Sequence, residues 1–275
     1  MTVVESSSSL DTRPRPPLGV FAILGRSFGL IRGAFLPLVG VCFLYSLAIQ
    51  IGGFGIGLWL ANRGIQLGTV EQAAETGFSA IQIVLFVLLG LVLTIVFSAF
   101  SGAIFHVALK RDAGERTSAG KAIGVGFRFM LPMFLCFILV SLLIAAGLVA
   151  LVVPGVWLAG VYGLAPVVMI GDDRARGVLG RTRRLSKDYR WPLVGLFALL
   201  YLVLIAISMI VGLFAVLVPA DFSNTTTVLL RYLLLDAPVS AVTTALFVAV
   251  CAVAYHRLVA IKDGDGSEAL RTVFE

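Results

Sequence analysis

Long uncharged stretches dominate the chain, and short segments rich in basic residues separate them. The four longest have 30, 34, 43 and 30 positions, at residues 33–62, 76–109, 129–171 and 191–220. A helix needs about 20 apolar residues to cross the hydrocarbon core of a bilayer. The third stretch is therefore long enough for two helices, and Val153-Pro154-Gly155 is where a turn between them is expected.

A sixth apolar stretch runs from about Ala237 to His256. The pattern therefore predicts an all-α integral membrane protein with six transmembrane helices. The expected helices lie at 36–60, 79–106, 131–152, 156–171, 192–217 and 236–257.

The basic residues fall almost entirely on one side of these six helices. With an even number of spans both termini share a side, and 19 of the 21 Lys and Arg residues lie there. Arg63 and Arg231 fall on the other side. Because cytoplasmic loops of membrane proteins are enriched in Lys and Arg, this asymmetry predicts a multi-pass protein of the bacterial inner membrane with both termini in the cytoplasm.

Three of the basic segments share a spacing. A glycine and a cation stand eleven residues before a proline, counted from the cation, in Gly25-Arg26 with Pro37, Gly120-Lys121 with Pro132 and Gly180-Arg181 with Pro192. Apolar residues alternate with cations at helical spacing in the segment before Pro37. The pattern predicts three cytoplasmic interfacial amphipathic helices, each followed by a transmembrane hairpin, in a threefold internal repeat of elbow helix plus hairpin.

Composition narrows the class of protein further. Of 275 residues, 59% are hydrophobic and 13% are charged, with a net charge of +6. This excludes an ordinary soluble enzyme, a disordered protein and a disulfide scaffold, because too little polar surface is available. Cys42, Cys136 and Cys251 all lie in apolar stretches, which favours buried packing over a disulfide or a zinc site.

The two polar ends of the sequence are expected to lie outside the bundle. Residues 1–17 are rich in serine and proline and predict a disordered N-terminal tail. Residues 18–262 form the six-helix membrane domain, and residues 263–275 are expected to be a solvated cytoplasmic C-terminal tail.

Candidate chemistry is sparse. A cluster of cations is expected to bind anionic lipid headgroups or a membrane partner: Arg181, Arg183, Arg184, Lys187 and Arg190. Three polar side chains within the predicted spans are further candidates: Gln50, Gln82 and Asp236. Asp236 and Arg231 are five residues apart and are not expected to face each other well on one α-helix.

The sequence shows no HExxH, GxSxG or Walker pattern and no pair of mid-membrane carboxylates, so no catalytic residue, metal site or cofactor is predicted. The favoured function is a non-enzymatic membrane scaffold or accessory protein, with membrane lipids, a second copy or another membrane protein as partner and no nucleic acid. The alternative is a small-solute transporter or lipid translocator, and an intramembrane enzyme is a third class.

Residues 151–191 read LVVPGVWLAGVYGLAPVVMIGDDRARGVLGRTRRLSKDYRW. Pro154-Gly155 and Ala165-Pro166 are followed by an acid and then by a segment that contains Thr182, Leu185, Lys187 and Trp191. This stretch resembles the bacterial membrane domain that accompanies some glycerophosphoryl diester phosphodiesterases. The resemblance implies a stand-alone inner-membrane member without the catalytic domain, so the phosphodiesterase activity is not expected.

Overall fold

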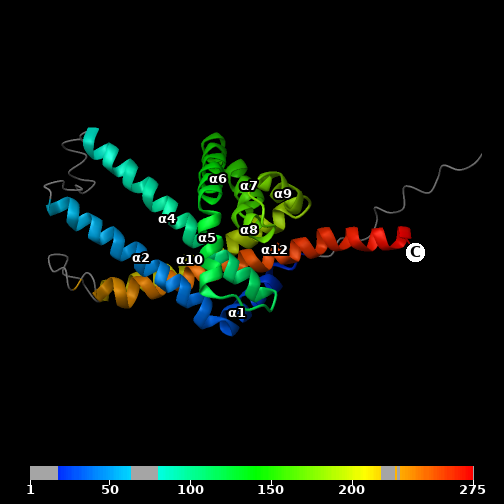
Figure 1. Ribbon diagram of the computed structural model, residues 1–275, viewed down its shortest axis with the longest axis horizontal. Helices are drawn as coiled ribbons and strands as arrows, with labels where there is room; N and C mark the ends of the chain where they lie inside the picture. The colour runs from blue at the N-terminus through cyan, green and yellow to red at the C-terminus, as the bar shows by residue number, and fades with distance from the viewer. Residues whose placement is uncertain (1–17, 63–79, 218–226, 228–229, 275) are drawn as a thin grey trace, which may run out of the picture.

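The computed structural model describes residues 18–62, 80–217, 227 and 230–274, and these residues form an almost wholly helical bundle (Figure 1). The helices in chain order are α1 (Val20–Gly33), α2 (Phe35–Asn62), α4 (Ala80–Asp112), α5 (Ala119–Arg128), α6 (Met130–Ala150), α7 (Val152–Tyr162), α8 (Ala165–Gly171), α9 (Val178–Ser186), α10 (Arg190–Leu217), the π-helical turn η1 (Tyr232–Asp236) and α12 (Ala237–Phe274). The predicted N-terminal tail, residues 1–17, lies outside the described residues.

Within the described residues, six helical segments are long and apolar enough to cross a membrane. They are Phe35–Gly53, Ile83–Asp112, Met130–Val149, Val153–Gly171, Arg190–Leu213 and Leu233–Asp263. The six-helix membrane class predicted from the apolar pattern is thus confirmed. The helix α12 runs past the predicted end at residue 257 to Phe274, so the helical backbone continues into the expected C-terminal tail.

A short helix precedes each of three long helices. In α2, α6 and α10, a proline is the third residue: Pro37, Pro132 and Pro192. Proline fits there because the first turn of a helix has no intrahelical partner for its N–H group. The short helices α1, α5 and α9 each bury one stripe against the bundle. Their position in a headgroup layer and a threefold arrangement stay predictions.

The connection between the third and fourth spans differs from the expected one. The chain turns at Leu151, which has an extended backbone, and Pro154-Gly155 lies inside the first turn of α7. The two helices touch through glycines, since a Cβ on Gly147 would lie 2.9 Å from the Gly155 Cα. Gly155 is therefore needed for close packing and not for the turn.

The fourth span is two helices and not one kinked helix. The helix α7 ends at Tyr162, and α8 begins at Ala165 with Pro166 in its first turn. Pro166 has no N–H to donate to the carbonyl of Tyr162, four residues earlier, and its ring crowds that carbonyl, so the helix is interrupted between them. The short α8 is almost completely buried.

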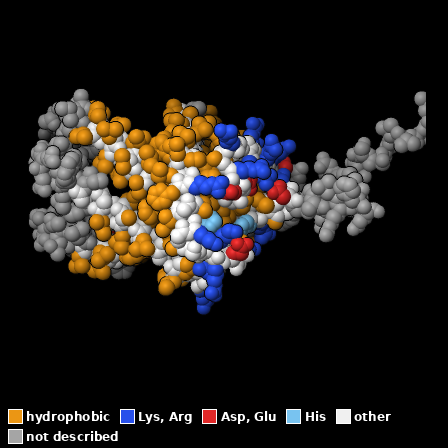
Figure 2. All heavy atoms as spheres, in the orientation of Figure 1, with side chains coloured by type: hydrophobic (Ala, Val, Ile, Leu, Met, Phe, Trp, Pro, Cys, Tyr) orange, Lys and Arg blue, Asp and Glu red, His pale blue; other side chains and the backbone are white. Residues whose placement is uncertain are grey.

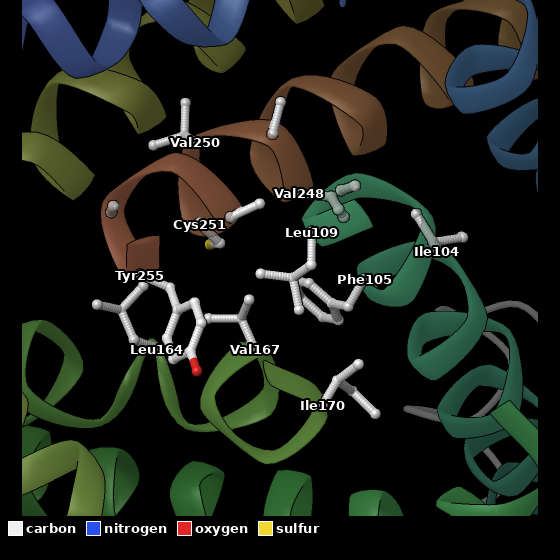
Figure 3. Packing of buried hydrophobic residues seen from close by; sticks show 14 of the residues in the cluster. Ile104, Phe105, Leu109, Leu164, Val167, Ile170, Val248, Val250, Cys251 and Tyr255 are labelled. Atoms are coloured by element: carbon white, nitrogen blue, oxygen red, sulfur yellow. The ribbon is translucent and has the colours of Figure 1, made fainter. Parts of the chain in front are cut away.

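The helix α12 lies in the middle of the molecule and packs against α1, α2, α4, α8, α9 and α10. In the last span 61% of the most apolar window is buried, against 17% for the span in α10. Ala241, Ala245 and Ala249 form a fully buried stripe of small residues along it, as expected where helices approach closely in a membrane. Figure 3 shows where α12 meets α4 and α8, with Cys251 and Tyr255 pointing into the shared core.

Charged side chains gather at one end of the bundle, which we call the charged end (Figure 2). It contains α1, α5 and α9, the last turn of α4 and residues 255–263 of α12. Large hydrophobic side chains cover most of the visible surface away from this end (Figure 2). The charges are therefore segregated from the apolar surface.

Candidate functional site

A buried carboxylate ties three helices together at the charged end. Asp112 is the last residue of α4, and its side chain is only 3% exposed. Its Oδ1 accepts a hydrogen bond from Arg26 Nε of α1 at 3.0 Å, and its Oδ2 lies 2.6 Å from His256 Nδ1 of α12. Because an ionised carboxylate only accepts, Nδ1 of His256 donates to it. Two charge-assisted contacts thus offset the burial of this acid.

A second carboxylate forms a similar junction beside the first. Asp172 directly follows α8 and accepts hydrogen bonds from Arg181 Nε at 3.0 Å and from the Tyr255 hydroxyl at 2.6 Å. Tyr255 and His256 are neighbours in α12, so one turn of that helix contacts both acids. Gly171 leaves room for this arrangement, because a Cβ there would collide with the Tyr255 ring.

Arg181 is the bridge between Asp172 and the far end of α12. It donates to both oxygens of Asp263, with Nη2 2.5 Å from Oδ2. The hydrogen bond to Asp263 is the largest cause of a raised pKa for the Arg181 guanidinium, and the nearby Asp172 charge acts in the same direction. Arg181 therefore stays charged and is held in place by two carboxylates of the protein.

The five cations predicted to bind a lipid or a partner divide into two groups. Arg181 is engaged by two carboxylates, and the Arg190 guanidinium lies 4.8 Å from the centre of the Trp157 ring. Such cation–π contacts stabilise a partly desolvated arginine. The remaining three, Arg183, Arg184 and Lys187, are exposed and have no ion-pair partner among the described residues. Of the five predicted cations, only these three present free charge within the described structure.

The polar candidates inside the spans have local partners. Gln50 donates to the Ser46 hydroxyl at 2.9 Å, one turn earlier on α2. Arg231 Nε lies 4.0 Å from Asp236 Oδ2, against the expectation that residues five apart would face each other poorly. The reason is η1, because a π-helix bonds residue i to i+5 and so aligns side chains at that spacing. The side chain of Gln82, in α4, lies outside the described part.

Two surface ion pairs and an open cleft complete the description of the charged end. Lys262 contacts Asp188 at 3.0 Å, and Arg128 contacts Asp173 at 3.3 Å. Next to them an open cleft of about 670 Å³ is lined by residues of the segment between α8 and α9, by α9 itself and by α12: Val168, Asp172, Arg174, Arg176, Gly177, Val178, Gly180, Arg181, Arg184 and Asp263. Its rim carries three arginines that make no ion pair within the described structure.

Reasoning from the sequence did not single out Asp112 as a centre of contacts, nor Arg174 and Arg176 as cleft residues. The signal for Asp112 is a lone acid at the end of an apolar helix, where an unpaired charge would be costly to bury. The partners, Arg26 and His256, are 86 and 144 residues away in the chain, so no local pattern could identify them.

The chemistry of this end is ion pairing and anion attraction. Among the residues that the structure describes, no three His, Cys, Asp or Glu side chains group so that they could hold a metal ion. Cys42, Cys136 and Cys251 are buried on three different helices. The acids of the charged end whose side chains the structure describes are engaged by internal partners, whereas several of the described arginines are not, so the surface available to a ligand there is cationic.

Comparison with known proteins agrees with a membrane protein. A segment of 71 residues is 41% identical to part of a UPF0259 membrane protein from Pectobacterium carotovorum. The match covers 26% of this chain and 28% of that relative. No protein-family model and no solved structure matches the chain. The similarity supports a bacterial membrane protein, and the association with glycerophosphoryl diester phosphodiesterases stays an expectation.

Proposed function

We propose that this chain is a non-enzymatic protein of the bacterial inner membrane whose charged end lies in the cytoplasm and engages anionic lipid headgroups. It acts as a scaffold or accessory within the membrane. One observation carries the proposal. Surface cations without an ion-pair partner and exposed large apolar side chains on short helices occur together at one end of the bundle.

The short helices have the composition of membrane-surface elements. The helix α1 buries Ile23 and Ser27 while Phe21 and Phe28 are exposed. The helix α5 likewise buries Ala122 and exposes large apolar side chains, Ile123 and Phe127. Exposed aromatic and aliphatic residues beside Lys and Arg are typical of helices that lie at the headgroup level. This arrangement favours contact with lipid over contact with water.

The charge distribution supports the proposed orientation. Of the Lys and Arg residues that the structure describes, Arg231 alone lies towards the end opposite the charged end. Lys and Arg are enriched in cytoplasmic loops, and a cation near an anionic leaflet contributes on the order of 1 kcal/mol of attraction. The free cations of α9 would thus strengthen contact with anionic lipid.

The competing function, a small-solute transporter or lipid translocator, needs polar groups that line a path to the middle of the membrane. Gln50 contacts Ser46 on its own helix, and Asp236 contacts Arg231 one π-helical turn away. Neither lines the clefts at the charged end or the groove between α10 and α12. The geometry therefore favours a scaffold role.

The test is lipid selectivity of the full-length protein in phosphatidylcholine vesicles. Spin-labelled phosphatidylglycerol is expected to associate with the protein more strongly than spin-labelled phosphatidylcholine at low salt. The preference should fall at about 1 M salt, where the Debye length is about 3 Å. The variant R183Q/R184Q/K187Q should lose several-fold of the preference.

The control variant, R183K/R184K, keeps the positive charge and changes the shape of the charged group. It is expected to retain the preference for phosphatidylglycerol. Absence of any preference for phosphatidylglycerol in the unmodified protein, or an unchanged preference in the neutral variant, would overturn the proposal. A preference that persists at high salt would also count against a headgroup interaction.

A further inference from the structure

The arginine-lined cleft at the charged end opens beside an apolar groove. The groove, of about 440 Å³, lies between the first turns of α6 and the residues that lead from α8 into α9. Leu131, Leu135 and Leu139, spaced one helical turn apart, form its wall on α6 and are all exposed. Met169 and Leu179 close the other side. This groove therefore offers a strip of apolar surface that runs along α6 from its first turn.

The cleft and the groove adjoin. Arg176, Gly177 and Val178 line both, so the cationic space and the apolar space meet at the start of α9. The apolar wall then follows a membrane-spanning helix away from the charged end, while Arg174 and Arg184 line the cationic side. Going from the charged end into the bundle, a ligand would meet guanidinium groups first and leucine side chains next.

We infer that this combined site binds one anionic phospholipid molecule, with its phosphate among Arg174, Arg176 and Arg184 and an acyl chain against α6. Arginine suits this ligand because its planar guanidinium can donate two parallel hydrogen bonds to a phosphate. The order of polar and apolar surface matches a phospholipid, which has a phosphate next to its acyl chains. A soluble phosphate has no apolar part that could occupy the groove. The inference rests on the proposed function and gives it a defined ligand.

The cleft also contains acids, and their contacts explain why it remains cationic. Asp172 and Asp263 both face Arg181, and Tyr255 donates a further hydrogen bond to Asp172. Their negative charge is thus directed at Arg181. Arg174, Arg176 and Arg184 make no such pair within the described residues, so their charge is available to a ligand.

Native mass spectrometry of the full-length protein in nonionic detergent, titrated with phosphatidylglycerol, tests the inference. The dissociation constant of the first lipid bound should rise about tenfold in R174Q/R176Q, as expected for lost charge-assisted hydrogen bonds. The matched variant R32Q/R116Q removes the same charge from two exposed arginines outside the cleft. Its dissociation constant should stay within about twofold of the unmodified value.

The apolar half has its own pair of variants. L135W fills the groove and should weaken binding of phosphatidylglycerol, whereas L44W changes an equally exposed leucine of α2 outside the groove and should not. Glycerophosphoglycerol, which has the headgroup without acyl chains, and inorganic phosphate should both fail to displace the lipid. Thermal unfolding of each variant checks that it is folded.

Equal weakening in R174Q/R176Q and R32Q/R116Q would overturn the site and leave general attraction to the charged end. Displacement of the lipid by either soluble phosphate would overturn the lipid as occupant. Both results are separate from the proposed function, which is tested by the preference of the unmodified protein and of its neutral variant for anionic lipid in vesicles.

Discussion

At the scale of single residues, two carboxylates organise the charged end. Asp112 and Asp172 each end or follow an apolar helix, and each accepts hydrogen bonds from two different helices. A buried charge is costly unless it is paired and hydrogen-bonded, so these acids hold α1, α9 and α12 in one relative position.

Replacing Asp112 with alanine tests this role. We expect D112A to lower the free energy of unfolding by about 2 kcal/mol, because two hydrogen bonds to a charged group are lost and His256 is left without its acceptor. Unfolding in detergent, followed by circular dichroism, measures the change.

The control for D112A is E115Q. Glu115 forms an exposed pair with Lys110 at 2.8 Å, and exposed ion pairs contribute little. We expect the free energy of unfolding of this variant to stay close to that of the unmodified protein. If E115Q lowers the free energy of unfolding as much as D112A does, the buried contacts of Asp112 do not stabilise the protein more than an exposed ion pair.

The sequence predicts that cations gather at the charged end, but it does not predict which side chains they contact. The excess of Lys and Arg around α9 was visible in the sequence, but Arg181 and Arg190 proved to have internal partners. Which cations are free depends on Asp172, Asp263 and Trp157, whose side chains reach them only through the packing of separate helices. Local spacing contains no information on such pairings.

At the scale of elements, glycine determines how closely α4 and α5 approach. A Cβ on Gly126 would collide with the Ala99 carbonyl oxygen of α4, whereas a Cβ on Gly124 of the same helix would meet no atom within 4 Å. The two glycines differ only in which face of α5 they occupy. One is therefore fixed by packing and the other is not.

We expect opposite effects of alanine at these two glycines. G126A should lower stability by about 1–3 kcal/mol, the usual cost of forcing extra atoms into a packed interface. G124A should leave stability unchanged or raise it by about 0.5 kcal/mol, because alanine restricts the unfolded chain and favours the helix. Thermal unfolding of both variants in the same detergent measures the difference, and equal behaviour would contradict the close contact.

The pattern of apolar residues predicted where the spans lie, but it did not predict the backbone conformation at their ends. Pro154-Gly155 was predicted to form a turn because proline and glycine are frequent in turns. The chain instead turns at Leu151, and Gly155 lies against Gly147. The π-helical η1 was likewise invisible, since apolar windows do not distinguish α- from π-helical backbone. Such details arise from tertiary packing.

At the scale of the whole molecule, the separation of charge predicts which end faces the cytoplasm. Ala113 is exposed at the charged end, and Leu151 is 68% exposed at the end of α6 that lies away from the charged end. The native cysteines are buried, so single cysteines introduced at these positions can be labelled selectively. A membrane-impermeant maleimide should label L151C in intact spheroplasts of a bacterial host, and A113C only after permeabilisation.

The reverse labelling pattern would place the charged end outside the cell and contradict the orientation. Labelling of both cysteines in intact spheroplasts would indicate leaky cells, which the unmodified protein and a soluble cytoplasmic marker control for.

The central position of α12 has a consequence for synthesis. This helix follows the other five spans in the chain, yet it supplies His256 to Asp112 and Tyr255 to Asp172. During translation the earlier helices must enter the bilayer before their common packing partner exists. Insertion and assembly are therefore separated in time. Until the last span is inserted, Asp112 lacks His256 and Asp172 lacks Tyr255, and this incomplete intermediate is the state that membrane quality control would encounter.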